Sequence, residues 1–244
     1  MFVQLPLKIG LKEDANFDTF VAETEIVAMG VAKFQQGLIN SQSDFILLEG
    51  ESKSGKTHLL QAACRFFSEK QSSEKSSAVF LPLSDKSLPI VPPILEGLET
   101  VNLICIDDVD EIIGKKEWEL ALASLIVKSQ VLGKKMIVSS KLAINNWAIV
   151  TKELSDAMMV ASTIKLSRLK ETEAIIEALT KRSKHTGFEF SFKLGDYLIK
   201  KFSNDLSELI EALDFIEKAS IIQKRKITLY FVKQILADVK PGIK

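Results

Sequence analysis

One stretch of eight residues constrains the fold of this chain more than any other. Residues 50–57 read GESKSGKT, which has the spacing G-x-x-x-x-G-K-S/T of a phosphate-binding loop, or P-loop. Such a loop binds an anion when it joins a strand to a helix, because its backbone N–H groups and the helix N-terminus then point at one place. The apolar run FILLE (45–49) precedes the loop. Apolar side chains follow it at helical spacing, at Leu59, Leu60, Ala63 and Phe67.

The loop residues have distinct expected roles around a nucleotide, ADP or ATP with Mg²⁺. Gly50 and Gly55 let the backbone wrap around the phosphates, Lys56 can reach the β- and γ-phosphates, and Thr57 can ligate Mg²⁺. The predicted nucleotide-binding residues of this segment are Gly50, Ser52, Lys53, Ser54, Gly55, Lys56, Thr57 and His58. His58 is the weakest of them, because a packing or helix-surface role explains a histidine at that position more simply.

A second motif, LICIDDVD (103–110), is an apolar strand that ends in carboxylates. Asp107 at the strand tip can hold Mg²⁺ through water, and Asp108 lies where a water-polarising carboxylate would sit. Alone, such a strand end is as well explained by a solvated turn. Together with the P-loop it indicates the second half of a nucleotide site, with Thr57 and Asp107 as the metal-binding residues.

Alternating strands and helices predict the fold class α/β, with a parallel five-stranded sheet covered by helices on both faces. The expected strands lie in five short apolar runs: 45–49, 78–83, 102–107, 136–140 and 162–166. The polar stretch SEKQSSEKSS (68–77) is predicted to be a solvated loop.

After about residue 167 the pattern becomes purely helical, which predicts a small all-helical domain. Gly187 is expected to close a helix that begins near Lys170. Asp205 and Thr228 are expected to cap the next two helices. The predicted divisions are an N-terminal tail (1–12), an α/β nucleotide-binding domain (13–167) and a helical domain (168–244).

Composition restricts the class of partner. The chain has 32 Lys+Arg against 32 Asp+Glu, which argues against a globally basic nucleic-acid binder. Contact with nucleic acid is therefore expected mainly through partner proteins. The sequence contains no uncharged apolar stretch of about 18 residues, so no membrane span is predicted. Cys64 and Cys105 lie in apolar segments and are expected to be reduced core residues, as in a cytoplasmic protein.

Four segments together resemble one family: NFDTFV (16–21), GKTHLLQA (55–62), IDDVDEI (106–112) and KRKITLYFVKQIL (224–236). They are similar to the AAA+ core of the bacterial initiator DnaA. The closer resemblance is to the DnaA regulatory inactivators, in which an AAA+ core and a helical lid follow a short tail. The resemblance covers essentially the whole chain.

The resemblance implies a binding peptide for the DNA polymerase sliding clamp (β subunit) in the tail, where QLPLKI (4–9) is similar to that peptide. The implied contact residues are Gln4, Leu5, Pro6, Leu7 and Ile9. Physically, an amide and apolar anchors on an extended segment suit a partner's groove, and Pro6 favours the extended form. Without the resemblance, a frayed tail or an edge strand would explain the segment better.

The resemblance also implies a function: a nucleotide-bound negative regulator of replication initiation, which binds the clamp and DnaA and promotes hydrolysis of the ATP on DnaA. Such a protein would be cytoplasmic, and nucleoid-associated through the clamp. The alternative is an autonomous AAA+ ATPase, such as a helicase loader or a truncated initiator, working as a homo-oligomer. A third interpretation is an interaction protein with a vestigial P-loop.

Three positions depart from the family. Ala157 in ELSDAM (153–158) stands where the family has an arginine finger, and Ser207 stands where it has the sensor arginine of the lid. KLAI (141–144) replaces D-R-P-P. Lys152 or Arg168 could substitute for the finger after a local shift. Because such an arginine contributes ~10³ or more in rate, we assign no catalytic residue and expect the chain's own hydrolysis to be weak or absent.

Overall fold

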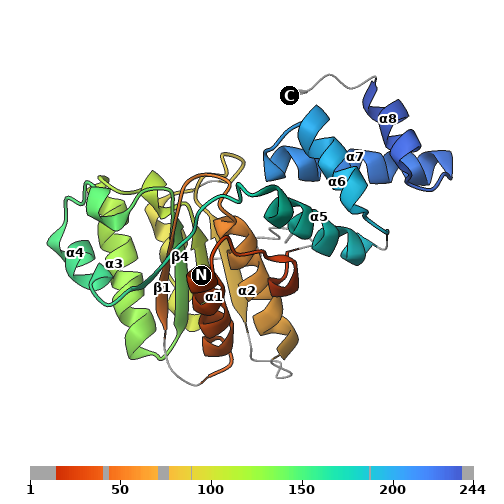
Figure 1. Ribbon diagram of the computed structural model, residues 1–244. Coiled ribbons are helices and arrows are strands. Elements are labelled where there is room, and N and C mark those ends of the chain that lie inside the picture. Colours follow the sequence, from red (N-terminus) through yellow and green to blue (C-terminus); the bar gives the residue numbers. More distant parts are fainter. Residues whose placement is uncertain (1–14, 41–43, 71–76, 89, 187, 238–244) are drawn as a thin grey trace. The chain divides into compact units, whose positions relative to one another are not determined.

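The computed structural model describes residues 15–40, 44–70, 77–88, 90–186 and 188–237 (Figure 1). These residues form two compact units. The first contains residues 15–17 and 24–167, and the second contains residues 18–23 and 168–237. Segment 18–23 therefore groups with the helical unit, although it precedes the sheet in sequence. The predicted tail (1–12) and Gly187 lie outside the described residues.

The first unit is built on a parallel sheet of five strands, which confirms the predicted fold class. In chain order the strands are β1 (Phe45–Glu49), β2 (Ala78–Pro82), β3 (Leu103–Asp107), β4 (Lys135–Ser140) and β5 (Ser162–Lys165). Their order across the sheet is β2-β3-β4-β1-β5. All pairs are parallel, so the carboxyl ends of the strands lie at one edge. Each strand falls within or next to one of the five apolar runs.

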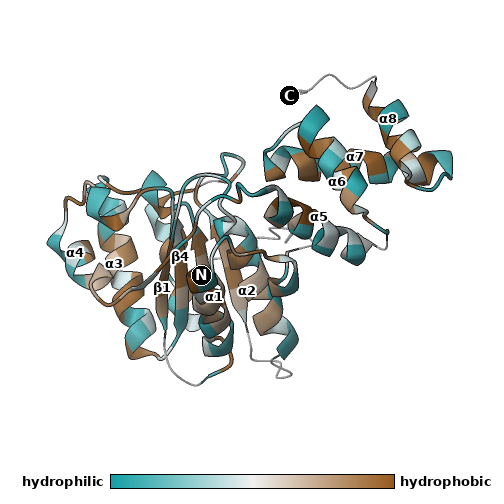
Figure 2. Ribbon diagram, viewed as in Figure 1, coloured by the Kyte–Doolittle hydropathy of each residue, from teal (hydrophilic) through white to brown (hydrophobic). Residues whose placement is uncertain are grey.

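Helices cover both faces of this sheet (Figure 1). The helices of the unit are α1 (Glu25–Gly37), α2 (Lys56–Lys70), α3 (Lys116–Val131) and α4 (Lys152–Met158), with short 3₁₀ turns at 92–95, 98–100, 109–111 and 144–146. Successive strand residues point to opposite faces, and alternate side chains such as Leu47 and Ile106 belong to one core cluster with side chains of α3 and α4. Figure 2 shows β1 and β4 as largely hydrophobic, and β1, β3 and β4 are buried along their whole length, as expected for strands covered on both faces.

The solvated loop predicted over 68–77 begins later than expected. Residues 68–70 belong to the last turn of α2, where the Ser68 hydroxyl donates a hydrogen bond to the carbonyl of Cys64 at 2.8 Å. The prediction was wrong there because the polar residues are the exposed side of a helix whose other side buries Phe67. Residues 71–76 lie outside the described part of the chain.

The second unit is a small helical domain with its own core. It contains α5 (Thr172–Thr186), α6 (Phe192–Lys201), α7 (Leu206–Gln223) and α8 (Leu229–Ala237), and one 3₁₀ turn (Phe17–Thr19) straddles the two units. The core is formed by apolar side chains from all four helices, among them Leu179, Leu198, Leu213 and Phe231. Among the residues that the structure describes, no helix has the length and apolar character needed to cross a membrane.

Both predicted caps in the helical unit are confirmed. The Asp205 carboxylate accepts hydrogen bonds from the N–H groups of Ser207 at 2.9 Å and Glu208 at 3.2 Å. The Thr228 hydroxyl accepts one from the N–H of Phe231 at 3.2 Å. These bonds satisfy donors that have no partner within the helix, which fixes where α7 and α8 begin.

Candidate nucleotide-binding site

The P-loop lies between β1 and α2, and its glycines are required by the backbone. Gly55 has a φ of 92°, in the left-handed region that favours glycine. A Cβ on Gly50 would lie 2.2 Å from the carbonyl oxygen of Leu166, the residue after β5. Any larger residue at position 50 would therefore push the loop away from the end of β5. The two glycines of the motif thus allow the loop to wrap closely against the edge of the sheet.

Lys56, the first residue of α2, directs its ammonium back into the loop. Its Nζ donates hydrogen bonds to the carbonyl oxygens of Gly50 at 2.6 Å and Glu51 at 2.8 Å, and the residue is only 5% exposed. Burial lowers the pKa of Lys56, and the nearby carboxylates of Asp107 and Asp108 oppose that shift. The charge is therefore poorly hydrated and placed to favour an anion held by the loop.

Thr57 and Asp107, 50 positions apart in sequence, are in direct contact. The Thr57 hydroxyl donates to Asp107 Oδ2 at 2.6 Å, and the Ser139 hydroxyl donates to Asp107 Oδ1. Burial raises the pKa of Asp107, while these two hydrogen bonds act in the opposite direction. A hydroxyl and a carboxylate oxygen side by side are the hard ligands that Mg²⁺ prefers, so the pair fits a site for this ion.

Asp108 has an unusual backbone conformation and well-defined partners. Its φ of 57° and ψ of 50° place it in the left-handed region, which turns the chain sharply after β3. Its N–H donates to the Ser139 hydroxyl at 3.0 Å, and its Oδ2 accepts from the Ser84 hydroxyl at 2.6 Å. Lys141 Nζ lies 3.5 Å from the other carboxylate oxygen, Oδ1.

The structure also places the remaining predicted residues of the loop. Ser52 and Lys53 are exposed, whereas Ser54 is buried and its Oγ has no hydrogen-bond partner among the described residues. An anion in the loop would give this hydroxyl an acceptor. The Nε2–H of His58 donates to the carbonyl oxygen of Asn16 at 2.9 Å, so His58 links the start of α2 to the segment before the first 3₁₀ turn.

The three departures from the family pattern have clear structural settings. Ala157 is a residue of α4 that faces the core and is only 7% exposed, and the single basic residue of α4 is the exposed Lys152. Ser207 lies in the first turn of α7, where its N–H is bonded to Asp205. Lys141, which opens KLAI, directly follows β4 and contacts Asp108.

Sequence reasoning did not identify three residues that shape the acidic end of β3: Ser84, Ser139 and Lys141. Each lies at or just after the carboxyl end of β2 or β4, the two strands that flank β3. The available signal was that each residue ends or follows an apolar run. The order of strands across the sheet was needed to bring them to Asp107 and Asp108.

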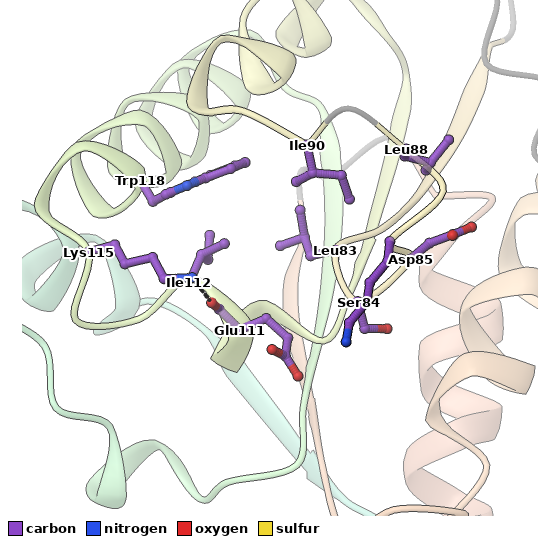
Figure 3. A pocket seen from close by; sticks show the side chains of 10 residues that line it. Leu83, Ser84, Asp85, Leu88, Ile90, Glu111, Ile112, Lys115 and Trp118 are labelled. Atoms are coloured by element: carbon purple, nitrogen blue, oxygen red, sulfur yellow. Dashed lines mark hydrogen bonds between the residues drawn. The ribbon is translucent and has the colours of Figure 1, made fainter.

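A separate hollow of about 270 Å³ lies at the same edge of the sheet (Figure 3). Its lining comes from the segment after β2 and the segment after β3, with Ile90, Ile112 and Trp118 on its apolar walls. No residue of the P-loop is among the described residues that line it. The hollow is therefore distinct from the phosphate-binding segment.

The thiols of Cys64 and Cys105 interact in the core, although they are distant in sequence. Both are buried and neither forms a disulfide. Burial raises the pKa of Cys105 well above its ordinary value, and the neighbouring Cys64 adds to that shift. The two thiols therefore pack as core residues between α2 and β3.

A P-loop after the strand β1, an acidic pair at the end of β3 and a helical lid define a P-loop protein of the AAA+ class. Solved structures share this fold. Domain III of the replication initiation protein DnaA from Thermotoga maritima has a TM-score of 0.73 at 16% identity, covering 94% of this chain and 98% of that one. AMPPCP-bound DnaA from Aquifex aeolicus has a TM-score of 0.65 at 18% identity, and the match covers 88% of this chain and 69% of that one.

Two sequence comparisons narrow the class. A family model described as the lid domain of Hda matches residues 172–236. An uncharacterized protein from Haemophilus influenzae is 31% identical over 234 residues, which cover 96% of this chain and 98% of that protein. The chain belongs to the same family as that protein, and its helical unit matches the lid of Hda. Its fold is similar to that of DnaA domain III.

Proposed function

We propose that this chain is a nucleotide-bound negative regulator of replication initiation, which attaches to the sliding clamp and promotes ATP hydrolysis by DnaA. The Hda lid match and the DnaA-like fold support a DnaA-related replication regulator. The observation that carries the proposal is the Hda lid match in a chain whose P-loop and acidic pair meet at Thr57 and Asp107. A regulator of this kind needs a nucleotide site and a partner surface of the DnaA type.

The proposed ligand is ADP or ATP with Mg²⁺. The DnaA structure from Aquifex aeolicus is described as AMPPCP-bound, which supports nucleotide binding by the equivalent loop here. Gly50–Thr57 would hold the phosphates, with Thr57 and Asp107 near the metal ion. The bound nucleotide would also stabilise the folded protein by mass action, because only the folded chain forms the site.

The chain's own turnover is proposed to be weak. An arginine finger stabilises the charge that develops on the transferred phosphoryl group. The finger position of the family is here the buried Ala157, and the position of the sensor arginine is Ser207. Nucleotide would then serve as a structural and regulatory ligand, and the hydrolysis that matters would occur on DnaA.

One observation favours the autonomous ATPase as a second candidate. Asp108 is retained directly after Asp107, at the position of a water-polarising carboxylate. In that case the chain would act as a homo-oligomer, in which a neighbouring copy supplies the missing cation. ATP turnover that rises with protein concentration and needs no DnaA would favour this candidate.

We also propose the domain boundaries and roles along the chain: a clamp-binding tail (1–12), the AAA+ domain (13–167) and the lid (168–244). QLPLKI (4–9) lies outside the described residues, so its role rests on the resemblance. Contact with the clamp would explain how a chain with balanced charge reaches DNA, since the clamp would supply the link.

Deletion of residues 1–9 is expected to weaken capture by an immobilised β clamp by at least about tenfold, because the amide and apolar anchors of the tail are removed. Titration of the full chain and the deleted chain over a clamp surface measures the change. Lys8→Ala serves as a matched control, because it keeps Gln4, Leu5 and Leu7 and should retain capture. Equal capture of the full and deleted chains, with equal ADP binding, would contradict the tail assignment.

A further inference from the structure

Asp108 stands at the position in the sequence expected for a water-polarising carboxylate, yet both of its carboxylate oxygens are engaged by this chain. Oδ2 accepts a hydrogen bond from the Ser84 hydroxyl at 2.6 Å. Oδ1 lies 3.5 Å from the ammonium of Lys141. The side chain of Asp108 is only 14% exposed, so little of it remains open to water.

Lys141 is held at that place by the turn that follows β3. Its backbone N–H donates to Asp110 Oδ1 at 3.0 Å, and its Nζ lies 3.4 Å from Glu111 Oε1. Burial alone would lower the pKa of Lys141, but the carboxylates of Asp108, Asp110 and Glu111 outweigh burial and raise it. The side chain therefore stays charged and bridges two acidic residues that follow β3.

We infer that Lys141, assisted by Ser84, forms an internal lock that holds the Asp108 carboxylate in an ion pair and keeps this chain's own ATP hydrolysis low. The inference rests on the proposed binding of nucleotide and adds a cause of weak turnover besides the absent arginines. The cause is the positive charge of Lys141, a residue of this same chain that directly follows β4.

The chemistry explains why such a pair would oppose hydrolysis. In hydrolysis, the water oxygen forms a bond to the γ-phosphorus, the bond from that phosphorus to the ADP oxygen breaks, and a water proton passes through a base to solvent. In the ion pair, both oxygens of the Asp108 carboxylate are directed at protein donors, the Ser84 hydroxyl and the Lys141 ammonium. Because these partners occupy both oxygens, Asp108 in the lock is poorly placed to orient a water molecule.

The test uses Lys141→Met in the full chain. Methionine has an unbranched side chain that ends at the ε-carbon, so it removes the ammonium and keeps the backbone N–H to Asp110. Turnover at saturating ATP and Mg²⁺ is expected to rise about tenfold over the unmodified chain, a small part of the roughly 10²–10⁴-fold that a well-positioned base contributes. The rise should vanish in Lys141→Met/Asp108→Asn, because the released carboxylate is then absent. Lys116→Met, at an exposed lysine of α3, is the matched control.

A second measurement tests the lock without turnover. In nucleotide-free protein, the effect of Asp108→Asn on the unfolding midpoint is measured twice, once in the otherwise unmodified chain and once in the Lys141→Met variant. The two effects are expected to differ by about 2 °C, as for a partly buried ion pair in a chain of this size. Additive effects would show that the two side chains do not interact, which would overturn the lock.

The two measurements separate failure of the lock from failure of the proposed function. Normal nucleotide binding by Lys141→Met with unchanged turnover would overturn the lock and leave the proposed function standing. Weaker ATP binding with unchanged ADP binding and no rise in turnover would also overturn it, because Lys141 would then serve the γ-phosphate directly. If even the unmodified chain binds no nucleotide, the proposed function fails, and the nucleotide-free comparison still decides whether the pair exists.

Discussion

Lys56→Ala is expected to weaken binding of both ADP and ATP by about 100-fold, the loss that follows when a charged hydrogen bond is removed from a buried site. The Lys56 ammonium belongs to a residue that is 5% exposed, and hydrogen bonds to the carbonyls of Gly50 and Glu51 hold it inside the P-loop. Calorimetric titration with each nucleotide measures the effect.

The substitution is not expected to unfold the chain. Because burial lowers the pKa of Lys56, the buried charge opposes folding, and its removal relieves that cost. Lys70→Ala, which removes one charge from the other end of α2, is the matched control and should bind nucleotide normally. Unchanged affinity in a folded Lys56→Ala protein would overturn the assignment of residues 50–57.

Glu119→Ala is expected to lower the free energy of unfolding by about 3–5 kcal/mol, the cost of breaking a buried charged network. The Glu119 side chain lies in α3 and is wholly buried. Its carboxylate accepts hydrogen bonds from the N–H groups of Gly114 at 2.8 Å, Val150 at 3.0 Å and Thr151 at 2.8 Å, and from the Thr151 hydroxyl at 2.7 Å. Alanine would leave these donors without an acceptor.

The pH dependence gives an independent check. Burial alone would raise the pKa of Glu119, but the hydrogen bonds from Thr151, Gly114 and Val150 together outweigh it and lower the pKa. A lowered folded pKa stabilises the protein above the ordinary pKa of glutamate, and this contribution is lost as the pH falls through the folded value. The difference between the unmodified chain and Glu119→Ala should therefore shrink in acid.

Urea unfolding of Glu119→Ala beside Glu117→Ala measures this prediction. Glu117 is exposed on the same helix, and its replacement should change stability by less than about 0.5 kcal/mol. If the two variants were equally stable at neutral pH, the carboxylate of Glu119 would not hold the segment that leads into α4.

The local patterns of the sequence were sufficient to predict the strands and several helix boundaries. FILLE and LICID became buried strands because apolar, β-branched runs of five residues suit a sheet covered on both faces. Asp205 and Thr228 cap helices because their short polar side chains reach the free N–H groups of the next turn. The contact of Thr57 with Asp107 agrees with the expected pairing of the two motifs.

Contacts between residues that are distant in sequence could not be predicted from local patterns. Ser84 and Ser139 reach Asp108 and Asp107 only because β2 and β4 flank β3, and the sequence does not state that order. Glu119 looks like an ordinary glutamate of an amphipathic helix, since its partners at 150–151 lie about thirty residues later. Likewise, the burial of Ala157 depends on packing against residues distant in sequence, so the resemblance that placed Ala157 at the finger position did not indicate that this side chain is buried.

The most direct test of the central proposal is conversion of DnaA-bound ATP to ADP on DNA loaded with the clamp. With the full chain present, the conversion is expected to accelerate, whereas the chain lacking residues 1–9 and Lys56→Ala should each leave it near the unassisted rate. Capture of the full chain by the clamp without any acceleration of DnaA-ATP hydrolysis would contradict the proposed function.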